Sequence, residues 1–173
     1  MAQQVYVLRC HRYYGQTEGI FLKLEDIEKY LRAHPKQPSP REGMFSRKGD
    51  WGIFDHDEGH FVNYYFEVKR VPYLGTLDTQ KTWVGLDSGY YALYYKGHSW
   101  GDGVCIAASD DELRLKKVGL EKLLKEVYPK EKKAKEILKN LEMMEEDEVE
   151  KLWEKRVIED TFTTPCYIME VGD

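Results

Sequence analysis

Residues 55–60 are the best candidate for a metal site in this chain of 173 residues. Asp55, His56, Asp57 and His60 supply carboxylates and imidazoles, which are ligands that a divalent transition ion accepts. Two histidines four positions apart share one face only in a helix, whereas Gly59 before a strand-like run favours a turn. The segment therefore predicts either a divalent metal ion serving a small hydrolase or nuclease, or a solvated hairpin turn whose charges protect a sheet edge.

Arg9, His11 and Arg12 are the second candidate site, because they stand beside Tyr13 and Tyr14. Cations next to aromatic rings can receive a phosphate or stack on a base. In an extended strand, Arg9 and His11 fall on one face and Arg12 on the other. The run predicts ligand-binding residues of a nucleotide-binding or small-ligand-binding regulatory domain, or else only the polar outer face of a strand.

The third candidate is the glycine-rich loop 97–103, which carries His98, Trp100 and Asp102. A His–Asp pair could act as a general base and its orienting group, so His98 and Asp102 are candidate catalytic residues. Their spacing matches neither a nucleophile elbow nor a phosphate-cradling loop. Loops held by a rigid sheet often bind ligands, and Trp100 is then the expected contact. A plain connecting loop is the alternative.

Charge is unevenly distributed along the chain. The net charge is −5 and the pI about 5.6, which argues against a general nucleic-acid binder. Residues 114–139 hold ten basic and four acidic side chains, and residues 140–160 hold three basic and nine acidic ones. Two antiparallel helices with these charges would attract each other. The functional alternative is that residues 142–150, with six acids and no base, imitate a nucleic-acid backbone or dock on a basic partner.

The cysteines and the hydropathy pattern indicate the compartment. Cys10, Cys105 and Cys166 are odd in number, far apart and in apolar runs, which predicts buried thiols and a reducing cytoplasm. No run of 18 apolar residues or signal-peptide pattern occurs, so we expect neither a membrane span nor export. Lysine and glutamate number 37 against 7 asparagines and glutamines, a tendency of thermophile proteins.

These candidate sites need a sheet to position them, and residues 61–71 are its strongest predictor. Val62, Tyr64, Phe66 and Val68 fall on one face of an extended strand, and Asn63, Tyr65, Glu67 and Lys69 on the other. We expect one dry face, one wet face, and an end of the strand at Pro72. The other expected elements are strands at 4–14, 19–23, 44–54, 104–108 and 165–171, a hairpin of 81–86 with 90–96, and helices at 24–34, 109–129 and 130–159.

Two local features bear on the helices and on symmetry. Ser109 followed by Glu112 predicts a capping box, and Gly119 could divide the helix that it starts. Tyr6-x-Leu8 followed by Gly19-Ile20 and an acidic helix start resembles Tyr91-x-Leu93 followed by Gly103-Val104 and Asp110-Asp111. The chain could therefore consist of two related ββα halves, or of two ordinary units that look alike.

The sequence as a whole predicts a single α+β domain over residues 1–173, with a sheet-rich part at 1–108, a helical part at 109–160 and a returning strand at 161–173. Its antiparallel or mixed sheet of five to seven strands would carry helices on one face and a C-terminal helical hairpin. We expect a non-enzymatic accessory or inhibitor protein of a prokaryotic or viral system, which acts through a protein partner and needs no cofactor. The metal-dependent hydrolase and the ligand-binding regulatory domain remain as alternatives.

Overall fold

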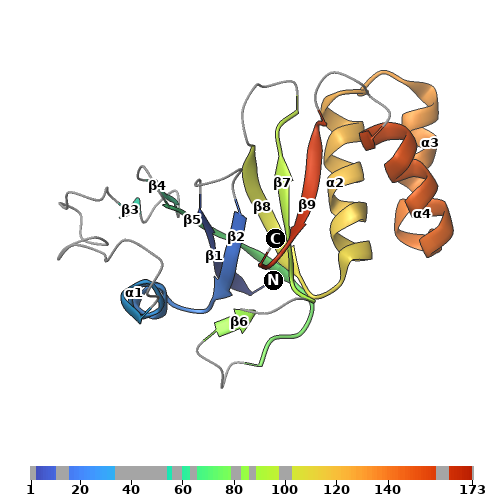
Figure 1. The fold of residues 1–173 in the computed structure, drawn as a ribbon. Helices are drawn as coiled ribbons and strands as arrows, with labels where there is room; N and C mark the ends of the chain where they lie inside the picture. Colours follow the sequence, from blue (N-terminus) through green and yellow to red (C-terminus); the bar gives the residue numbers. More distant parts are fainter. Residues whose placement is uncertain are drawn as a thin grey trace.

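The chain adopts an α+β fold, as expected, in a computed structural model that describes residues 3–10, 16–33, 54–55, 60–62, 66–78, 83–85, 89–97, 103–158 and 164–172. Figure 1 shows a curled sheet with α2, α3 and α4 on one side and α1 beside β1 and β2. The strands are β1 (Gln4–Cys10), β2 (Gln16–Phe21), β3 (Phe54–Asp55), β4 (His60–Val62), β5 (Phe66–Leu74), β6 (Trp83–Gly85), β7 (Tyr91–Tyr95), β8 (Val104–Ser109) and β9 (Cys166–Glu170). The helical elements are α1 (Leu24–Ala33), α2 (Glu112–Glu126), α3 (Lys132–Asn140), the 3-10 turn η1 (Leu141–Met143), α4 (Glu146–Trp153) and the π-helical turn η2 (Glu154–Ile158).

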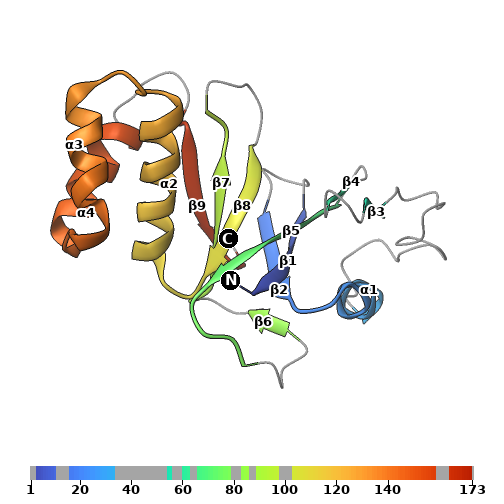
Figure 2. The ribbon, with the colours of Figure 1, turned by 180° about the vertical axis from the view of Figure 1, so that it is seen from behind.

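The sheet is mixed and curls back on itself. Its main order is β6-β2-β1-β5-β8-β7-β9, and β4 adds to β5 at the side. Only the pairing of β5 with β8 is parallel among the described pairs. The backbone N–H of Gly172, just after β9, donates to the carbonyl of Thr17 in β2 at 2.9 Å. Two strands that lie far apart in the sheet order are thus brought together, as the view from behind also shows (Figure 2).

The sheet is built from two units with the same connectivity and the same register. In the first unit β1 pairs with β2 and β5, and in the second β7 pairs with β8 and β9, all antiparallel. Leu8 lies opposite Gly19 and Val68, just as Leu93 lies opposite Ala107 and Ile168. A register shift follows Leu8 in one unit and Leu93 in the other. The two predicted ββα halves therefore exist, and each is extended by one more strand.

One detail of the predicted repeat is wrong. Tyr6 and Leu8 do correspond to Tyr91 and Leu93, but Gly19 does not correspond to Gly103. Gly19 is the partner of Leu8, whereas the partner of Leu93 is Ala107. Matching Gly19 with Gly103 is incorrect because the loop before β8 is longer than the loop before β2.

Strand alternation separates an inner face from an outer one. Val5, Val7, Val71, Ala92 and Tyr94 form part of a buried cluster inside the curl of the sheet. Residues that point the other way are covered by helices: Leu93, Ala107 and Cys166 pack with α2 and α4, and the Phe21 ring lies 5.4 Å from that of Tyr30 in α1. The helices thus cover one face of the sheet, as predicted.

The strand predicted at 61–71 is wrong as a single strand. Its first part is β4, which turns back and pairs antiparallel with β5, so that Phe61 lies opposite Val68. The second part continues through Pro72 to Leu74. A proline is tolerated there because its backbone nitrogen does not have to donate a hydrogen bond at that position of the register. Its expected wet face is also wrong, since Glu67 is only 8% exposed on the inner side of the curl.

Three further local predictions are corrected. The predicted hairpin of 81–86 with 90–96 does not form, because β6 pairs with β2 and β7 with β8 and β9. Asp111, not Ser109, caps α2 by accepting from the Arg114 amide, while the Ser109 hydroxyl donates to the Leu74 carbonyl. Gly119 does not divide α2, which continues through it.

Candidate binding groove beside helix α2

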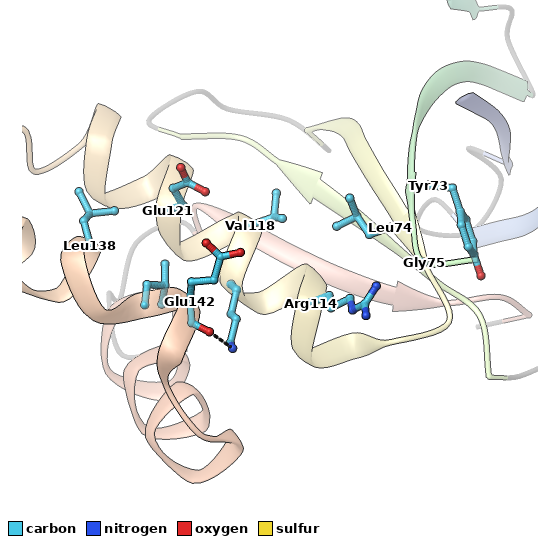
Figure 3. A pocket seen from close by; sticks show the side chains of 10 residues that line it. Tyr73, Leu74, Gly75, Arg114, Val118, Glu121, Leu138 and Glu142 are labelled. Carbon is cyan, nitrogen blue, oxygen red and sulfur yellow. Dashed lines mark hydrogen bonds between the residues drawn. The ribbon is translucent and has the colours of Figure 1, made fainter. Parts of the chain in front are cut away.

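A groove of about 600 Å³ lies where α2, α3 with η1, and the end of β5 meet. Figure 3 shows Arg114 pointing towards Tyr73 and Gly75 at one end, with Leu138 and Glu121 at the other. Its apolar lining consists of Leu74, Val118, Leu138 and Leu141. The volume falls within the range that a short peptide segment or a small ligand fills.

Helical spacing explains why α2 provides one wall. Arg114, Lys117, Val118 and Glu121 are three, four and seven positions apart, so they share one face of α2. The opposite wall repeats this spacing at Leu138, Leu141 and Glu142, across the junction of α3 with η1. The sequence predicted these helices but not the groove, because the groove depends on how far apart they pack.

The end of β5 closes the groove at a sharp bend. Gly75 has φ +136°, a backbone conformation that a side chain would strain, and a Cβ there would lie 3.2 Å from Oδ1 of Asp110. Tyr73 is buried beside it, and burial together with Asp110 raises the pKa of its hydroxyl. The hydroxyl is therefore neutral at ordinary pH and remains a hydrogen-bond donor.

Two basic side chains of the groove are held by neighbouring oxygen atoms. Lys117 Nζ donates to the Glu142 carbonyl at 3.0 Å, and Arg114 Nε lies 3.3 Å from the Asp111 carboxylate. Among the described residues that line the groove there is no histidine, cysteine or serine. A nucleophile with an adjacent base is therefore missing from this part of the molecule.

Acidic residues on α2 are matched by bases one turn away. Glu112 lies 3.2 Å from Lys116, Glu121 lies 2.5 Å from Lys125, and Lys122 lies 2.9 Å from Glu126. Pairs at this spacing stabilise a helix slightly and neutralise its surface. Each acid of α2 thus has a basic partner, and the five bases of the helix outnumber its three acids.

The acids that follow the groove wall are different. Glu142, Glu145, Glu146, Asp147 and Glu148 are all exposed, and none of them has an ion pair within the described part of the chain. The last three lie in the first turn of α4, where the helix dipole favours negative charge. Met143, between the first two, is 85% exposed. We call residues 142–148 the acidic segment.

The two charged stretches attract each other, as predicted, but not through the acidic segment. Two ion pairs join residues 114–139 to residues 140–160: Lys116 Nζ of α2 lies 2.6 Å from Glu150 Oε1, and Arg156 Nη2 lies 2.7 Å from Glu131 Oε1. No described ion pair joins a lysine of α3 to the acidic segment. The predicted attraction therefore accounts for Glu150 but leaves the acids of residues 142–148 unmatched.

Arg9, a predicted ligand-binding residue, lies inside the curled sheet. It is 2% exposed, its guanidinium carbon is 4.3 Å from the centre of the Tyr94 ring, and Nη1 donates to the Gly103 carbonyl at 3.3 Å. Nη2 also donates to the Tyr167 hydroxyl. The prediction that Arg9 lies on an outer strand face is wrong, because the inner face of this sheet accepts polar residues near one end.

The other predicted site residues are only partly located. The backbones of Asp55 and His60 are partners across the β3–β4 hairpin, as the turn interpretation requires. The described residues contain no group of three histidine, cysteine or acidic side chains that could hold a metal ion. The rest lie outside the described residues: His11, Arg12, His56, Asp57, His98, Trp100 and Asp102. The metal and catalytic hypotheses stay predictions.

Two cysteines confirm the prediction of buried thiols. Cys105 and Cys166 are both free and at most 2% exposed. Burial raises the pKa of each thiol to about 12. Neither thiol is therefore a reactive nucleophile in the folded protein.

Comparisons with known proteins give no identification: the sequence matches no protein-family model, and no match was found among curated proteins or solved structures. No helix in the described residues is long and apolar enough to cross a membrane. Function must therefore be argued from the groove and its surroundings.

Proposed function

We propose that this protein is a non-enzymatic binding module that recognises a basic segment of a partner protein. The observation that carries the proposal is the acidic segment, whose five carboxylates have no ion pair with any described residue, although the acids of neighbouring α2 are matched. Unmatched like charges repel one another, which opposes folding, so a bound counter-charge would relieve them. The helix dipole offsets this repulsion for Glu146, Asp147 and Glu148 but not for Glu142.

The groove supplies the apolar part of the same surface. Glu142 belongs to both features, since it lines the groove and begins the acidic segment. Leu138 and Leu141 offer apolar contacts, and the exposed Met143 adds an adaptable one. A partner segment that combines lysines or arginines with apolar side chains would match both. Charge complementarity would set its orientation and its association rate more than its affinity.

A pull-down with paired variants tests the proposal. The baits are the wild-type protein, Glu146→Gln with Glu148→Gln, and a matched control of Glu25→Gln with Glu136→Gln, which removes the same charge from exposed sites elsewhere. We expect the wild type and the control to capture a partner that the acidic-segment variant does not capture. Raising the salt concentration from about 50 mM to about 500 mM should release this partner.

The groove is tested separately with Leu138→Ser, after a melting curve has shown that the variant folds. It should weaken capture of the same partner without changing the salt dependence. Equal capture by all baits, or capture that salt does not affect, would contradict the proposal.

A further inference from the structure

A second cavity, of about 350 Å³, lies on the other side of α2, between α2, α4 with η2, and β9. Its charged lining is Glu112, Lys116, Glu150 and Glu154. Three carboxylates against one ammonium give a formal charge of −2 from these four side chains. Neither the groove nor the acidic segment includes these residues.

The ammonium of Lys116 is built into the wall of this cavity. Its side chain is 11% exposed, and Nζ lies 2.6 Å from Glu150 Oε1 and 3.2 Å from Glu112 Oε1. Burial lowers the pKa of Lys116, but the hydrogen bonds of Glu150 and Glu112 outweigh this and raise it overall. The lysine therefore stays charged and uses one oxygen of each carboxylate, while Glu154 has no ion pair among the described residues.

Apart from Thr164 and Tyr167, the rest of the lining is apolar, and part of it is exposed. Ile158 is 62% exposed although it borders the cavity, and Ile168 of β9 lies on the opposite side. Ile158 and Glu154 both belong to η2, whose π-helical winding is rare and occurs often at functional sites. Trp153, which is 7% exposed, fills the base.

We propose that this cavity binds a free aliphatic amine, with its ammonium at Glu154 and its alkyl chain along Ile158 and Ile168. An acidic rim over an apolar floor matches a cation that carries a hydrocarbon chain. A divalent metal ion matches less well, because Lys116 already holds the point between Glu112 and Glu150 and would repel it.

n-Pentylamine, titrated into the whole protein by calorimetry at low salt, tests this assignment. We expect a dissociation constant of about 1 mM, as for a few partly exposed ion contacts. Glu154→Gln should weaken binding about threefold, since one such contact is lost. Glu148→Gln, which removes the same charge from α4 outside the cavity, should change it by less than about 1.5-fold.

Three results would overturn the proposal: no binding of n-pentylamine, equal effects of the two variants, or displacement of n-pentylamine by an equal concentration of Mg²⁺. Nα-acetyl-lysine amide, which carries the same single charge, distinguishes the source of the ammonium. Weaker binding than that of n-pentylamine supports a free amine, and equal or tighter binding overturns that assignment in favour of a protein side chain. The basic-partner proposal is independent, because its variants leave Glu154 and Ile158 unchanged.

Discussion

The two ββαβ units share one backbone plan but fill their inner faces with different chemistry. Register places Arg9 opposite Thr17 and Glu67 in the first unit. At the corresponding positions of the second unit, Tyr94 lies opposite Cys105 and Tyr167. One unit thus contributes a cation, a hydroxyl and a carboxylate to the inner layer, and the other contributes two phenols and a thiol.

Contacts between the units explain why the difference is tolerated. Arg9 stacks on Tyr94 and donates to Tyr167, and the Thr17 hydroxyl lies 2.8 Å from that of Tyr94. The Tyr94 and Tyr167 rings are stacked, with centroids 5.2 Å apart. Each unit therefore satisfies polar groups of the other, and the units are complementary rather than interchangeable.

The helices on the outer faces of the two units begin alike. Ile27 of α1 and Leu115 of α2 occupy corresponding positions, and both are fully buried. Only α2 is followed by α3 and α4, and only this unit carries the groove, the acidic segment and the second cavity. The groove, the acidic segment and the second cavity, on which both proposals rest, thus lie on the second unit and the helices that follow it.

The strongest test of the comparison removes the cation that joins the units. Arg9→Met loses the stacking on Tyr94 and two hydrogen bonds, and leaves buried Glu67 with less counter-charge nearby. We expect the free energy of unfolding to fall by about 3 kcal/mol, because a buried cation loses two hydrogen bonds and its stacking on a ring. Urea denaturation measures it.

Two variants control that experiment. Lys29→Met removes a cation whose side chain is 79% exposed and should change the free energy of unfolding by less than about 0.5 kcal/mol. Adding Glu67→Gln to Arg9→Met should recover part of the loss, because the buried carboxylate is then neutral. A loss below about 1 kcal/mol for Arg9→Met would mean that the units do not depend on this contact.

A smaller loss of stability is expected from filling Gly119, a position at which the helices of the two units differ. α2 has Gly119 at the position where α1 has a leucine, and a Cβ at Gly119 would lie 3.0 Å from the Trp153 ring and 3.3 Å from Leu93. Alanine favours a helix over glycine by about 1 kcal/mol, but crowding a packed core costs about 1–3 kcal/mol. Because Trp153 and Leu93 are buried, we expect Gly119→Ala to destabilise the protein by about 1 kcal/mol.

The measurement is again urea denaturation, with Lys125→Ala as a control for helix propensity on the exposed side of α2. A gain of stability in Gly119→Ala would show that α4 can move away from α2. The close contact would then be a feature of packing that the helical extension does not require.

Local patterns in the sequence predicted part of this fold and could not predict the rest. Helical spacing at Ile27 and Tyr30 was sufficient for α1, and the match of Tyr6-x-Leu8 with Tyr91-x-Leu93 located the two units. Alternation across 61–71 predicted one strand, but in the β4–β5 hairpin Phe61 lies opposite Val68 and Val62 opposite Glu67, so the two arms alternate out of phase. Pairing partners at long range, such as β6 with β2, leave no local pattern.

The candidate site was harder to predict for the same reason. Arg9 was selected for its charge, but the curl of the sheet turns its face inward, and no local pattern encodes that curl. The acids at 142–148 were recognised from composition, yet their lack of partners depends on where α3 and α4 lie. Lys116 and Glu150 are 34 positions apart, so neither their contact nor the cavity beside it could be inferred from spacing.

The smallest expected effect concerns the attachment of the helical extension that follows α2. Arg156 donates from Nη1 and Nη2 to the two oxygens of Glu131 at 3.1 and 2.7 Å, joining η2 to the start of α3. The hydrogen bonds of Arg156 lower the pKa of Glu131 below its ordinary 4.5. A lowered folded-state pKa stabilises the protein above pH 4.5, and this contribution is lost as pH falls through the folded value.

Melting curves of the wild type and Glu131→Gln should therefore differ near neutral pH and converge in acid, whereas Glu136→Gln, an exposed acid of α3, should show no such convergence. A gap that stays constant into acid would mean that the charge of Glu131 does not hold the extension in place.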